Sequence, residues 1–366
     1  MALHFYLLKV SDITRETPEA VSVTFDIPSD LKEIFRFKHG QYITVKVPVD
    51  GEENRRAYSI SSSPIEEKIR IGVKKVEGGT VSVFMNEELK VGDFIEVMPP
   101  MGNFTIDLDP KHRKEYVFFG AGSGITPLLS IMKSILFTEK ESKIKLLYAN
   151  QYTHTIIYHE ELEKLSREYG DRFELTHILS RDEAWEGLKG RITGEICQEY
   201  VDEHLSCSPP EAEYFLCGPR DMMKDLTETL LKIGVDASNI HKESFTSALP
   251  DEVLKAETVG QSSAASGDDG ILKTREITII LYGEEHQIEV DEDETVLTAA
   301  MTKGVDPPFS CQIGACSTCR ARLKSGKVEM EAHDALMESE IEEGFILTCT
   351  AHPMSDDVVI DYDDNF

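Results

Sequence analysis

The chain has 366 residues, of which 40% are hydrophobic and 29% are charged, and its formal net charge is −29. This length allows two or three domains with sizeable cores. The negative charge argues against a nucleic-acid partner, because binding to phosphate groups needs basic patches. No stretch approaches the run of about 18 apolar residues that a membrane span needs, so we expect no membrane partner.

The cysteines and the first residues of the chain favour a cytoplasmic protein. An odd count of seven cysteines in a long chain argues against a disulfide framework. The N-terminal sequence MALHFYLLKV lacks the basic start, the long apolar run and the cleavage site of a signal peptide. Four cysteines gather toward the C-terminus, which indicates a metal site.

Residues 1–108 predict an antiparallel β-barrel, and residues 109–246 predict an α/β domain. In the first segment VSVTFDI, QYITVKV, KIRIGVKKV and DFIEVMPP have the alternating or β-branched pattern of short strands. In the second, buried strands such as YVFFGAG, KIKLLYAN and EYFLCGP alternate with helical segments such as PLLSIMKSILF and DMMKDLTETLLKIG. This alternation predicts βαβ units around a parallel sheet.

A linker and a third domain complete the chain. Residues 247–271 contain ETVGQSSAASGDDG, whose small polar residues predict a flexible linker. In residues 272–366, EITIIL and HQIEV predict a hairpin and VLTAAMTKG a helix, followed by a cysteine loop, a return strand and the strand-like ILTCTAHP. The expected molecule is therefore multidomain.

The cysteine loop CQIGACSTCR has the spacing C-x4-C-x2-C, through Cys311, Cys316 and Cys319, and Cys349 follows thirty residues later. This is the spacing of plant-type [2Fe–2S] ferredoxins, in which four thiolates hold two irons. Gly314 and its small neighbours would let backbone N–H groups approach the sulfurs and tune the potential. A structural zinc site is the alternative, but such sites usually use two C-x2-C pairs.

The segment RRAYSISSSP contains R-x-Y-S, formed by Arg56, Tyr58 and Ser59. An arginine can pair with a flavin phosphate, a tyrosine can flank the ring, and a hydroxyl can bond to the ring nitrogen N5. Alone, this motif is equally compatible with an ordinary strand end.

The segment IGVKKVEGGTVS follows at the distance expected for a second part of a flavin site. Its glycines and hydroxyls could present backbone N–H groups to a pyrophosphate. The predicted flavin-binding residues here are Val73, Gly79, Thr80 and Ser82.

A glycine loop, GAGSGITP, lies between a predicted strand and helix and could bring the backbone close to a pyrophosphate. It is not G-x-G-x-x-G, and no acidic residue ends the following strand, so the ordinary dinucleotide fold is excluded. The predicted nicotinamide-cofactor residues of this loop are Gly120, Gly122, Gly124, Thr126 and Pro127.

The motifs R-x-Y-S, G-x-x-S, G-x-G-x-T-P and C-G-P occur here in the order found in the ferredoxin–NADP reductase family, which this chain resembles. The last motif is Cys217-Gly218-Pro219. The resemblance implies that Cys217 borders the nicotinamide where hydride passes, that Ser59 supports flavin N5, and that Glu243 in KESF lies near the flavin. The alternatives are a buried thiol for Cys217 and a solvated strand-end charge for Glu243.

A flavin barrel, a nicotinamide domain and a C-terminal β-grasp ferredoxin are the domain order of class I-type reductases of multicomponent oxygenases. RAYSISSSP, GAGSGITPLLSI, FLCGP and ILTCTAHPMSDDVVIDYD resemble the phenylacetyl-CoA epoxidase reductases more than the phthalate dioxygenase type. This resemblance implies FAD, whereas the phthalate type implies FMN. The possible second phosphate site at residues 79–82 also favours FAD.

The sequence gives conflicting indications for NADPH and NADH. Ser180-Arg181 matches a pair that holds the 2′-phosphate in NADPH-using relatives, but Gln151 stands where many relatives have an arginine. We therefore expect NADPH or NADH, with a slight preference for NADPH.

The resemblance implies that hydride passes from NAD(P)H to FAD and that single electrons pass through the [2Fe–2S] cluster to a terminal oxygenase, most simply a phenylacetyl-CoA ring epoxidase of phenylacetate catabolism. Alternatives are a reductase of a Rieske aromatic or steroid hydroxylase and a redox-sensing binding protein. From residue 271 onward there are 7 Lys and Arg against 21 Asp and Glu, so this acidic segment could dock on a basic partner.

Overall fold

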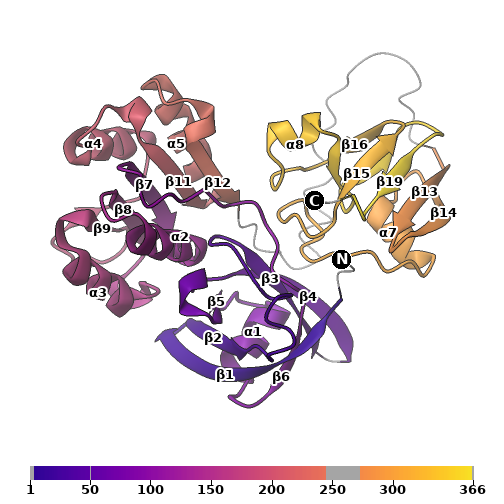
Figure 1. Ribbon diagram of the computed structural model, residues 1–366, viewed down its shortest axis with the longest axis horizontal. Helices are drawn as coiled ribbons and strands as arrows, with labels where there is room; N and C mark the ends of the chain where they lie inside the picture. Colours follow the sequence, from indigo (N-terminus) through magenta and orange to yellow (C-terminus); the bar gives the residue numbers. More distant parts are fainter. Residues whose placement is uncertain (1–3, 50, 245–272, 365–366) are drawn as a thin grey trace. The chain divides into compact units, whose positions relative to one another are not determined.

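The computed structural model describes residues 4–49, 51–244 and 273–364 (Figure 1). Among these residues, one compact unit consists of residues 6–49, 51–54 and 58–244, and the other consists of residues 4–5, 55–57 and 273–364. The predicted linker, residues 247–271, lies outside the described residues, and the bounds of the four predicted segments stay predictions. In the described ranges, no helix is long and apolar enough to cross a bilayer.

The N-terminal strands form a six-stranded antiparallel sheet in the order β4-β3-β6-β1-β2-β5. A bridge between Ile60, which follows β4, and Ile71 in β5 links the two edges, so the sheet closes as the predicted barrel. Closure leaves fewer unpaired backbone groups at the edges. The strands are β1 (Tyr6–Thr17), β2 (Ala20–Asp26), β3 (Tyr42–Val49), β4 (Glu52–Ser59), β5 (Ile69–Lys74) and β6 (Phe94–Val97).

One helix of this region, α1 (Thr80–Glu87), was not anticipated. Its sequence TVSVFMNE is rich in β-branched residues, whose local preference is for strands. The helix forms because Gly79 supplies an extended N-cap and because Val81 and Met85, four residues apart, are buried against the barrel core. Tertiary packing therefore outweighs local propensity here.

The predicted parallel sheet has the strand order β10-β9-β8-β7-β11-β12. Its strands are β7 (Glu115–Ala121), β8 (Lys143–Asn150), β9 (Phe173–Leu179), β10 (Leu188–Lys189), β11 (Glu213–Gly218) and β12 (Ile240–Ser244). Its helices are α2 (Ile125–Thr138), α3 (His159–Tyr169), α4 (Gly194–His204) and α5 (Arg220–Lys232). The short strand β10 and helix α4 were not among the predicted elements.

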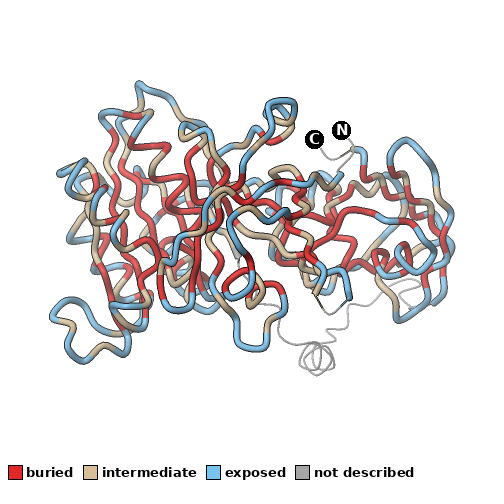
Figure 2. The backbone as a smooth tube through the Cα atoms, turned by 90° about the horizontal axis from the view of Figure 1, so that it is seen from below, coloured by how far each residue is buried: buried red, intermediate tan, exposed pale blue. Residues whose placement is uncertain are grey.

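Both faces of this sheet are buried, and Figure 2 shows by colour that buried residues predominate along the strands. In β7, Tyr116 and Phe118 pack in the core that contains α2 and α3, while Val117 and Phe119 pack in the core that contains α4 and α5. Alternate residues of a strand point to opposite faces, so a sheet with helices on both sides needs a continuous apolar run. The sequence YVFFGA meets this requirement.

The C-terminal part has the expected β-grasp character, with a mixed sheet of order β14-β13-β19-β15-β17 and a separate β16–β18 pair. The predicted hairpin and the helix after it are confirmed. The elements are β13 (Arg275–Leu281), β14 (Glu284–Val290), α7 (Val296–Thr302), β15 (Arg320–Ser325), β16 (Val328–Met330), α8 (Glu338–Glu342), β17 (Phe345–Leu347), β18 (Ala351–Pro353) and β19 (Val359–Asp361).

The barrel and the parallel sheet belong to one compact unit and are joined by buried polar contacts. Ser130 of α2 donates to the carbonyl of Ser62 at 2.6 Å, and the hydroxyls of Ser63 and Ser134 lie 2.8 Å apart. Arg70 of β5 pairs with Glu161 of α3 at 2.8 Å. Since these groups are shielded from water, the bonds fix how the two domains face each other.

The carboxylate of Glu139, at the end of α2, is completely buried. It accepts hydrogen bonds from the hydroxyls of Tyr116 at 2.9 Å and Ser142 at 2.7 Å, and from the backbone N–H of Asp109 at 3.2 Å. The ring of His112 contacts it at 2.9 Å. A buried carboxylate is tolerated because donors surround it, and it ties the segment before β7 to the end of α2.

We expect Glu139→Ala to lower the free energy of unfolding by about 2–4 kcal/mol, since it leaves the buried Tyr116 and Ser142 hydroxyls without an acceptor. Urea denaturation followed by circular dichroism measures this change. Glu141→Ala is the matched control, because Glu141 lies two residues away and is exposed. Equal stability of the two variants would contradict the structural role of Glu139.

Candidate functional site

The predicted residues Cys217 and Glu243 lie side by side at the carboxyl edge of the parallel sheet. Cys217 in β11 is in register with Gly120 in β7 on one side and with Glu243 in β12 on the other. In open α/β sheets, ligands bind outside the carboxyl ends of the strands. The sheet topology therefore brings together three residues that the sequence places up to 123 positions apart.

The Cys217 thiol is fully buried, and burial together with the nearby Glu243 carboxylate raises its pKa well above the ordinary value. Burial also raises the pKa of Glu243 to about 8. Both groups therefore favour their neutral forms at neutral pH. Such a neutral pair can border an uncharged ring at the sheet edge. Because a neutral thiol is a poor nucleophile, Cys217 is not suited to form a covalent bond to a ligand.

The glycine loop turns tightly from β7 into α2. Gly122 has a positive φ of 54°, and its carbonyl accepts a 2.8 Å hydrogen bond from the Tyr148 hydroxyl. A Cβ on Gly124 would lie only 2.2 Å from the carbonyl oxygen of Cys217. The loop and the C-G-P segment can approach this closely only because residue 124 has no side chain.

The C-G-P segment itself starts helix α5. Gly218 ends β11, and a Cβ there would lie 2.6 Å from Met222 and 3.0 Å from Ala121. Pro219 is the N-cap of α5. The amino ends of α2 and α5 thus lie beside each other at the strand ends, and the partial positive charge of helix amino ends suits an anionic group.

Strand β5, which carries the predicted flavin residue Val73, contacts the elements at this edge. At Gly72, next to Val73, an added Cβ would lie 2.6 Å from the Tyr158 hydroxyl and 3.0 Å from the Thr126 hydroxyl. Thr126 itself donates to the Ser123 carbonyl at 2.8 Å. The glycine at residue 72 lets the barrel touch the G-x-G-x-T-P helix, and sequence reasoning missed it because nothing local marks the contact.

The R-x-Y-S residues lie on β4. Ser59 at its end is buried, whereas Arg56 and Tyr58 are half-buried. One guanidinium N–H of Arg56 donates to the carbonyl of Arg55 at 2.7 Å. The strand therefore presents one buried hydroxyl and one cation with further donors to spare.

Gly79, Thr80 and Ser82 form the amino end of α1. Gly79 is the N-cap, Thr80 the first helical residue, and the Ser82 hydroxyl accepts from the Val76 N–H at 3.1 Å. A Cβ on Gly79 would lie 2.7 Å from this hydroxyl. The turn resembles other helix amino ends that receive phosphate groups.

Ser180 and Arg181 follow β9 and are exposed. Their backbone N–H groups donate to the carbonyls of Asn150 and Gln151, at 3.0 and 2.9 Å. The structure therefore places Arg181 directly beside Gln151. These are the two residues whose identities gave conflicting indications for NADPH and NADH.

The structure gathers the four C-terminal cysteines in one place. Cys311 accepts hydrogen bonds from Cys316 and Cys349, which lowers its pKa, and the backbone N–H groups of Ile313 and Ala315 also point to its sulfur. The pKa of Cys316 is raised by its bond to Cys311. Hydrogen bonds link Cys311 to Cys316 and Cys349, and Cys349 to Cys319, so the four thiols form one connected group that fits a tetrathiolate cluster.

Two details of the cysteine loop depart from the sequence analysis. Cys349 lies in a turn between β17 and β18 and not inside a strand, because the Thr350 N–H closes back on the Leu347 carbonyl at 3.2 Å. Glycine is required at residue 314 for two reasons. Its φ is 73°, and a Cβ there would lie 2.7 Å from the carbonyl oxygen of Ala332. The turn aims the lone fourth thiol at the loop.

The sequence matches three domain families. Residues 7–106 match the oxidoreductase FAD-binding domain, residues 118–228 the oxidoreductase NAD-binding domain, and residues 279–354 the 2Fe-2S iron-sulfur cluster binding domain. One subunit of the 1,2-phenylacetyl-CoA epoxidase of Escherichia coli is 36% identical over 98% of both chains. The chain belongs to the family of flavin and iron–sulfur reductase components of oxygenases.

Other members of this reductase family are nearly as similar. The ferredoxin reductase component of 3-ketosteroid-9-alpha-monooxygenase from Rhodococcus rhodochrous is 32% identical and covers 97% of this chain and 96% of its own. The glycine betaine monooxygenase reductase of Pseudomonas aeruginosa is 32% identical, with 93% and 91% covered. The solved phthalate dioxygenase reductase has the same fold, with a TM-score of 0.59 and 21% identity over 98% of both chains.

We expect Gly124→Ala to lower the free energy of unfolding by about 3 kcal/mol or more, since the new methyl group overlaps the Cys217 carbonyl. Gly122→Ala is the control, because its new Cβ would come no closer than 4.0 Å to another residue, the Lys74 ammonium nitrogen, so it loses only about 1–2 kcal/mol to its left-handed φ. Urea denaturation measures both. A smaller loss for Gly124→Ala than for Gly122→Ala would contradict the close contact.

Glu243 predicts a pH dependence of stability. Its pKa of about 8 in the folded protein exceeds the ordinary 4.5, so the folded state binds the proton more tightly. The free energy of unfolding should therefore fall as pH rises from about 5 to about 8. In Glu243→Gln this fall should be smaller, whereas the exposed control Glu195→Gln should follow the wild type. Parallel curves for all three proteins would refute the shift.

Proposed function

We propose that this oxygenase reductase passes electrons from NADPH or NADH to the terminal component of a phenylacetyl-CoA ring epoxidase, in the cytoplasm. The main support is the 36% identity to the Escherichia coli epoxidase component, which extends over 98% of both chains and all three domains. The NAD(P)H-dependent oxidoreductase activity belongs to the family as a whole. The choice of terminal component is the part that needs a test.

In this proposal Ser59, Cys217 and Glu243 border the place of hydride transfer. When bound, a flavin and an iron–sulfur cluster would supply the chemistry of hydride uptake and single-electron release. The chain contributes a buried hydroxyl on β4 and a neutral thiol beside a carboxyl at the ends of β11 and β12. None of these groups adds a full charge next to the rings at neutral pH.

The flavin is FAD in this proposal, as the FAD-binding domain family indicates. Arg56 and Tyr58 would hold and flank it, Val73 would line its site from β5, and Gly79, Thr80 and Ser82 would receive its second phosphate at the amino end of α1. The nicotinamide nucleotide would lie along the glycine loop, with its phosphates toward the amino end of α2. The residues of that loop are Gly120, Gly122, Gly124, Thr126 and Pro127.

We assign the [2Fe–2S] cluster to Cys311, Cys316, Cys319 and Cys349. Cys349→Ser should reduce the iron content from about two per chain to near zero, because a two-iron cluster needs four thiolates. The flavin content should stay unchanged. Cys207→Ser is the control, since Cys207 is a half-buried thiol of the nicotinamide domain. Colorimetric iron analysis that finds full iron in Cys349→Ser would remove Cys349 from the ligand set.

Arg181 decides the nucleotide preference in our proposal. It is exposed at the carboxyl end of β9, beside Ser180, and can pair with a 2′-phosphate. We expect Arg181→Ala to raise KM for NADPH about tenfold or more, because one charged hydrogen bond to the 2′-phosphate is lost. The KM for NADH, which lacks this phosphate, should stay nearly unchanged. Arg113→Ala, an exposed arginine before the amino end of β7, is the control. An equal rise in KM for NADPH and for NADH, measured by steady-state kinetics, would exclude this role.

The experiment that tests the proposed pathway is the capture of the partner. Extract from the native host is passed over the immobilised, reduced holoprotein, and the retained proteins are identified. Retention of a multisubunit di-iron oxygenase supports the phenylacetyl-CoA proposal. Retention of a Rieske oxygenase overturns the pathway and supports the second candidate, which the 32% identity to the 3-ketosteroid monooxygenase reductase favours.

A further inference from the structure

Three side chains that commonly bind metal ions converge outside the flavin, nicotinamide and cysteine sites. His159 and Glu163 belong to α3, and His177 belongs to β9. One ligand atom from each lies within 4.8 Å of the other two. Neither the sequence motifs nor the similarity to the oxygenase reductases assigns a role to this group.

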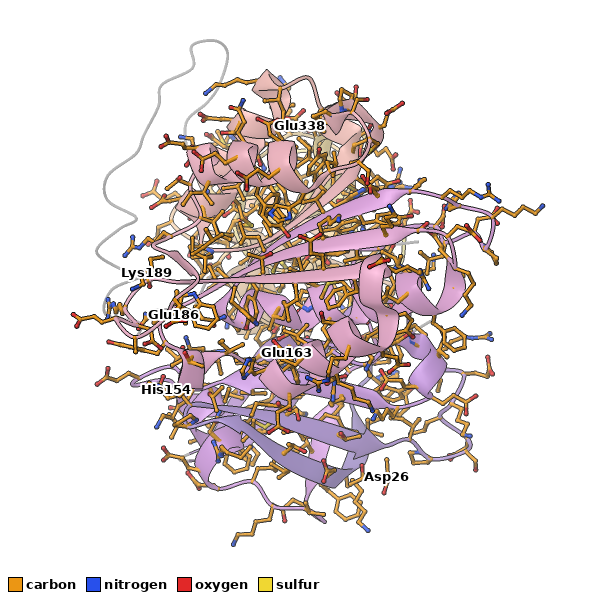
Figure 3. All side chains as sticks on the ribbon, turned by 90° about the vertical axis from the view of Figure 1, so that its left-hand side faces the viewer. Asp26, His154, Glu163, Glu186, Lys189 and Glu338 are labelled. Carbon is orange, nitrogen blue, oxygen red and sulfur yellow. The ribbon has the colours of Figure 1, made fainter. Side chains whose placement is uncertain are left out.

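The fold explains why the three side chains meet. Residues four positions apart on a helix share one face, which places His159 and Glu163 together. Helix α3 packs on the face of the sheet that carries alternate residues of β9, and the rings of His159 and His177 meet edge to face with centroids 5.6 Å apart. Figure 3 looks onto the side of the molecule that carries α3 and labels Glu163.

His177 is the unusual member of the group. It is only 7% exposed, and neither of its ring nitrogens has a hydrogen-bond partner among the described residues. The backbone of Tyr148 lies near the ring but outside hydrogen-bond geometry. Leaving a buried polar group unpaired costs about 1–3 kcal/mol, so such a group calls for a ligand.

We propose that His159, Glu163 and His177 form a binding site for a divalent transition-metal ion, with Zn²⁺ as the preferred ion. Two imidazoles and one carboxylate are a recurrent zinc ligand set that leaves a fourth position open. Ca²⁺ and Mg²⁺ are disfavoured because they prefer sites made of oxygen ligands. The bound ion would satisfy a ring nitrogen of His177 and fasten helix α3 to strand β9.

The geometry needs only small side-chain movements. Zinc–nitrogen and zinc–oxygen bonds are about 2.0–2.2 Å long, so the ligand atoms of a tetrahedral site lie about 3.3–3.6 Å apart. The present separations of up to 4.8 Å close to this range by rotation of the half-buried His159 and Glu163. The competing pair between Glu163 and Arg167, at 3.7 Å, is exposed and therefore weak.

Equilibrium dialysis of the holoprotein against Zn²⁺, with zinc and iron measured together, tests the proposal. We expect one zinc per chain in addition to the two irons of an intact [2Fe–2S] cluster. His159→Gln and Glu163→Gln should each weaken zinc binding at least about tenfold, because even changes outside the ligand shell cost 10–100-fold. Both residues are half-buried, so the variants should fold, and unchanged iron and flavin contents verify this.

Glu160→Gln is the matched control, since Glu160 is the exposed neighbour on the same helix and undergoes the same chemical change. It should bind zinc as the wild type does. Equal weakening by Glu160→Gln and Glu163→Gln would reduce the effect to general surface charge and overturn the site. A wild-type holoprotein that contains its two irons but binds no zinc would overturn the proposed site directly.

The only tryptophan of the chain, Trp185, provides a second readout. Its ring lies edge to face with His177, with centroids 6.3 Å apart. Co²⁺ bound at the site should quench the Trp185 fluorescence saturably, and excess Zn²⁺ should reverse the quenching. Quenching that persists unchanged in Glu163→Gln, or that Zn²⁺ does not reverse, would place the ion elsewhere.

Discussion

The contact between Gly124 and the carbonyl of Cys217 is the constraint on which the nicotinamide part of the molecule depends. With no Cβ at residue 124, the loop after β7 lies directly against the loop after β11. Gly120, in register with Cys217, continues this close approach inside the sheet. Two helix amino ends and a thiol thus reach one edge, and a side chain at residue 124 would separate them.

Charged side chains also determine how the barrel and the parallel sheet are arranged. At the border between barrel and sheet, Arg70 pairs with Glu161, and Lys133 bridges Glu161 at 2.8 Å to Glu66. Opposite charges that are partly buried hold each other only when they are well paired. The sheet edge beside Cys217 and Glu243 instead favours neutral groups. Charge therefore orients the two domains, while the proposed path of the hydride stays uncharged.

Much of this arrangement could be predicted from the sequence, because short motifs with fixed spacing record local geometry. The cysteine spacing, the glycine loop before α2 and the C-G-P turn are of this kind. Contacts between distant segments could not be predicted. Gly72 against Tyr158, and His159 against His177, join segments whose local patterns are those of an ordinary strand and helix.

Local propensity also gave the wrong secondary structure at two places where tertiary packing determines the conformation. The β-branched sequence of α1 forms a helix because its amino end is capped by Gly79 and its apolar face meets the barrel core. Cys349 lies in a turn, although ILTCTAHP has the pattern of a continuous strand, because the chain must bend to bring its thiol to the loop. In both places a tertiary requirement overrides the preference of the residues themselves.

The burial of Cys217 has a consequence for chemical durability. Oxidants and alkylating reagents attack thiolates far faster than thiols, and they need access to the sulfur. Cys217 has neither exposure nor an appreciable thiolate fraction at neutral pH. A cysteine at the centre of a redox enzyme is thereby protected from sulfenylation, and the site that handles reducing equivalents does not itself become a redox sensor.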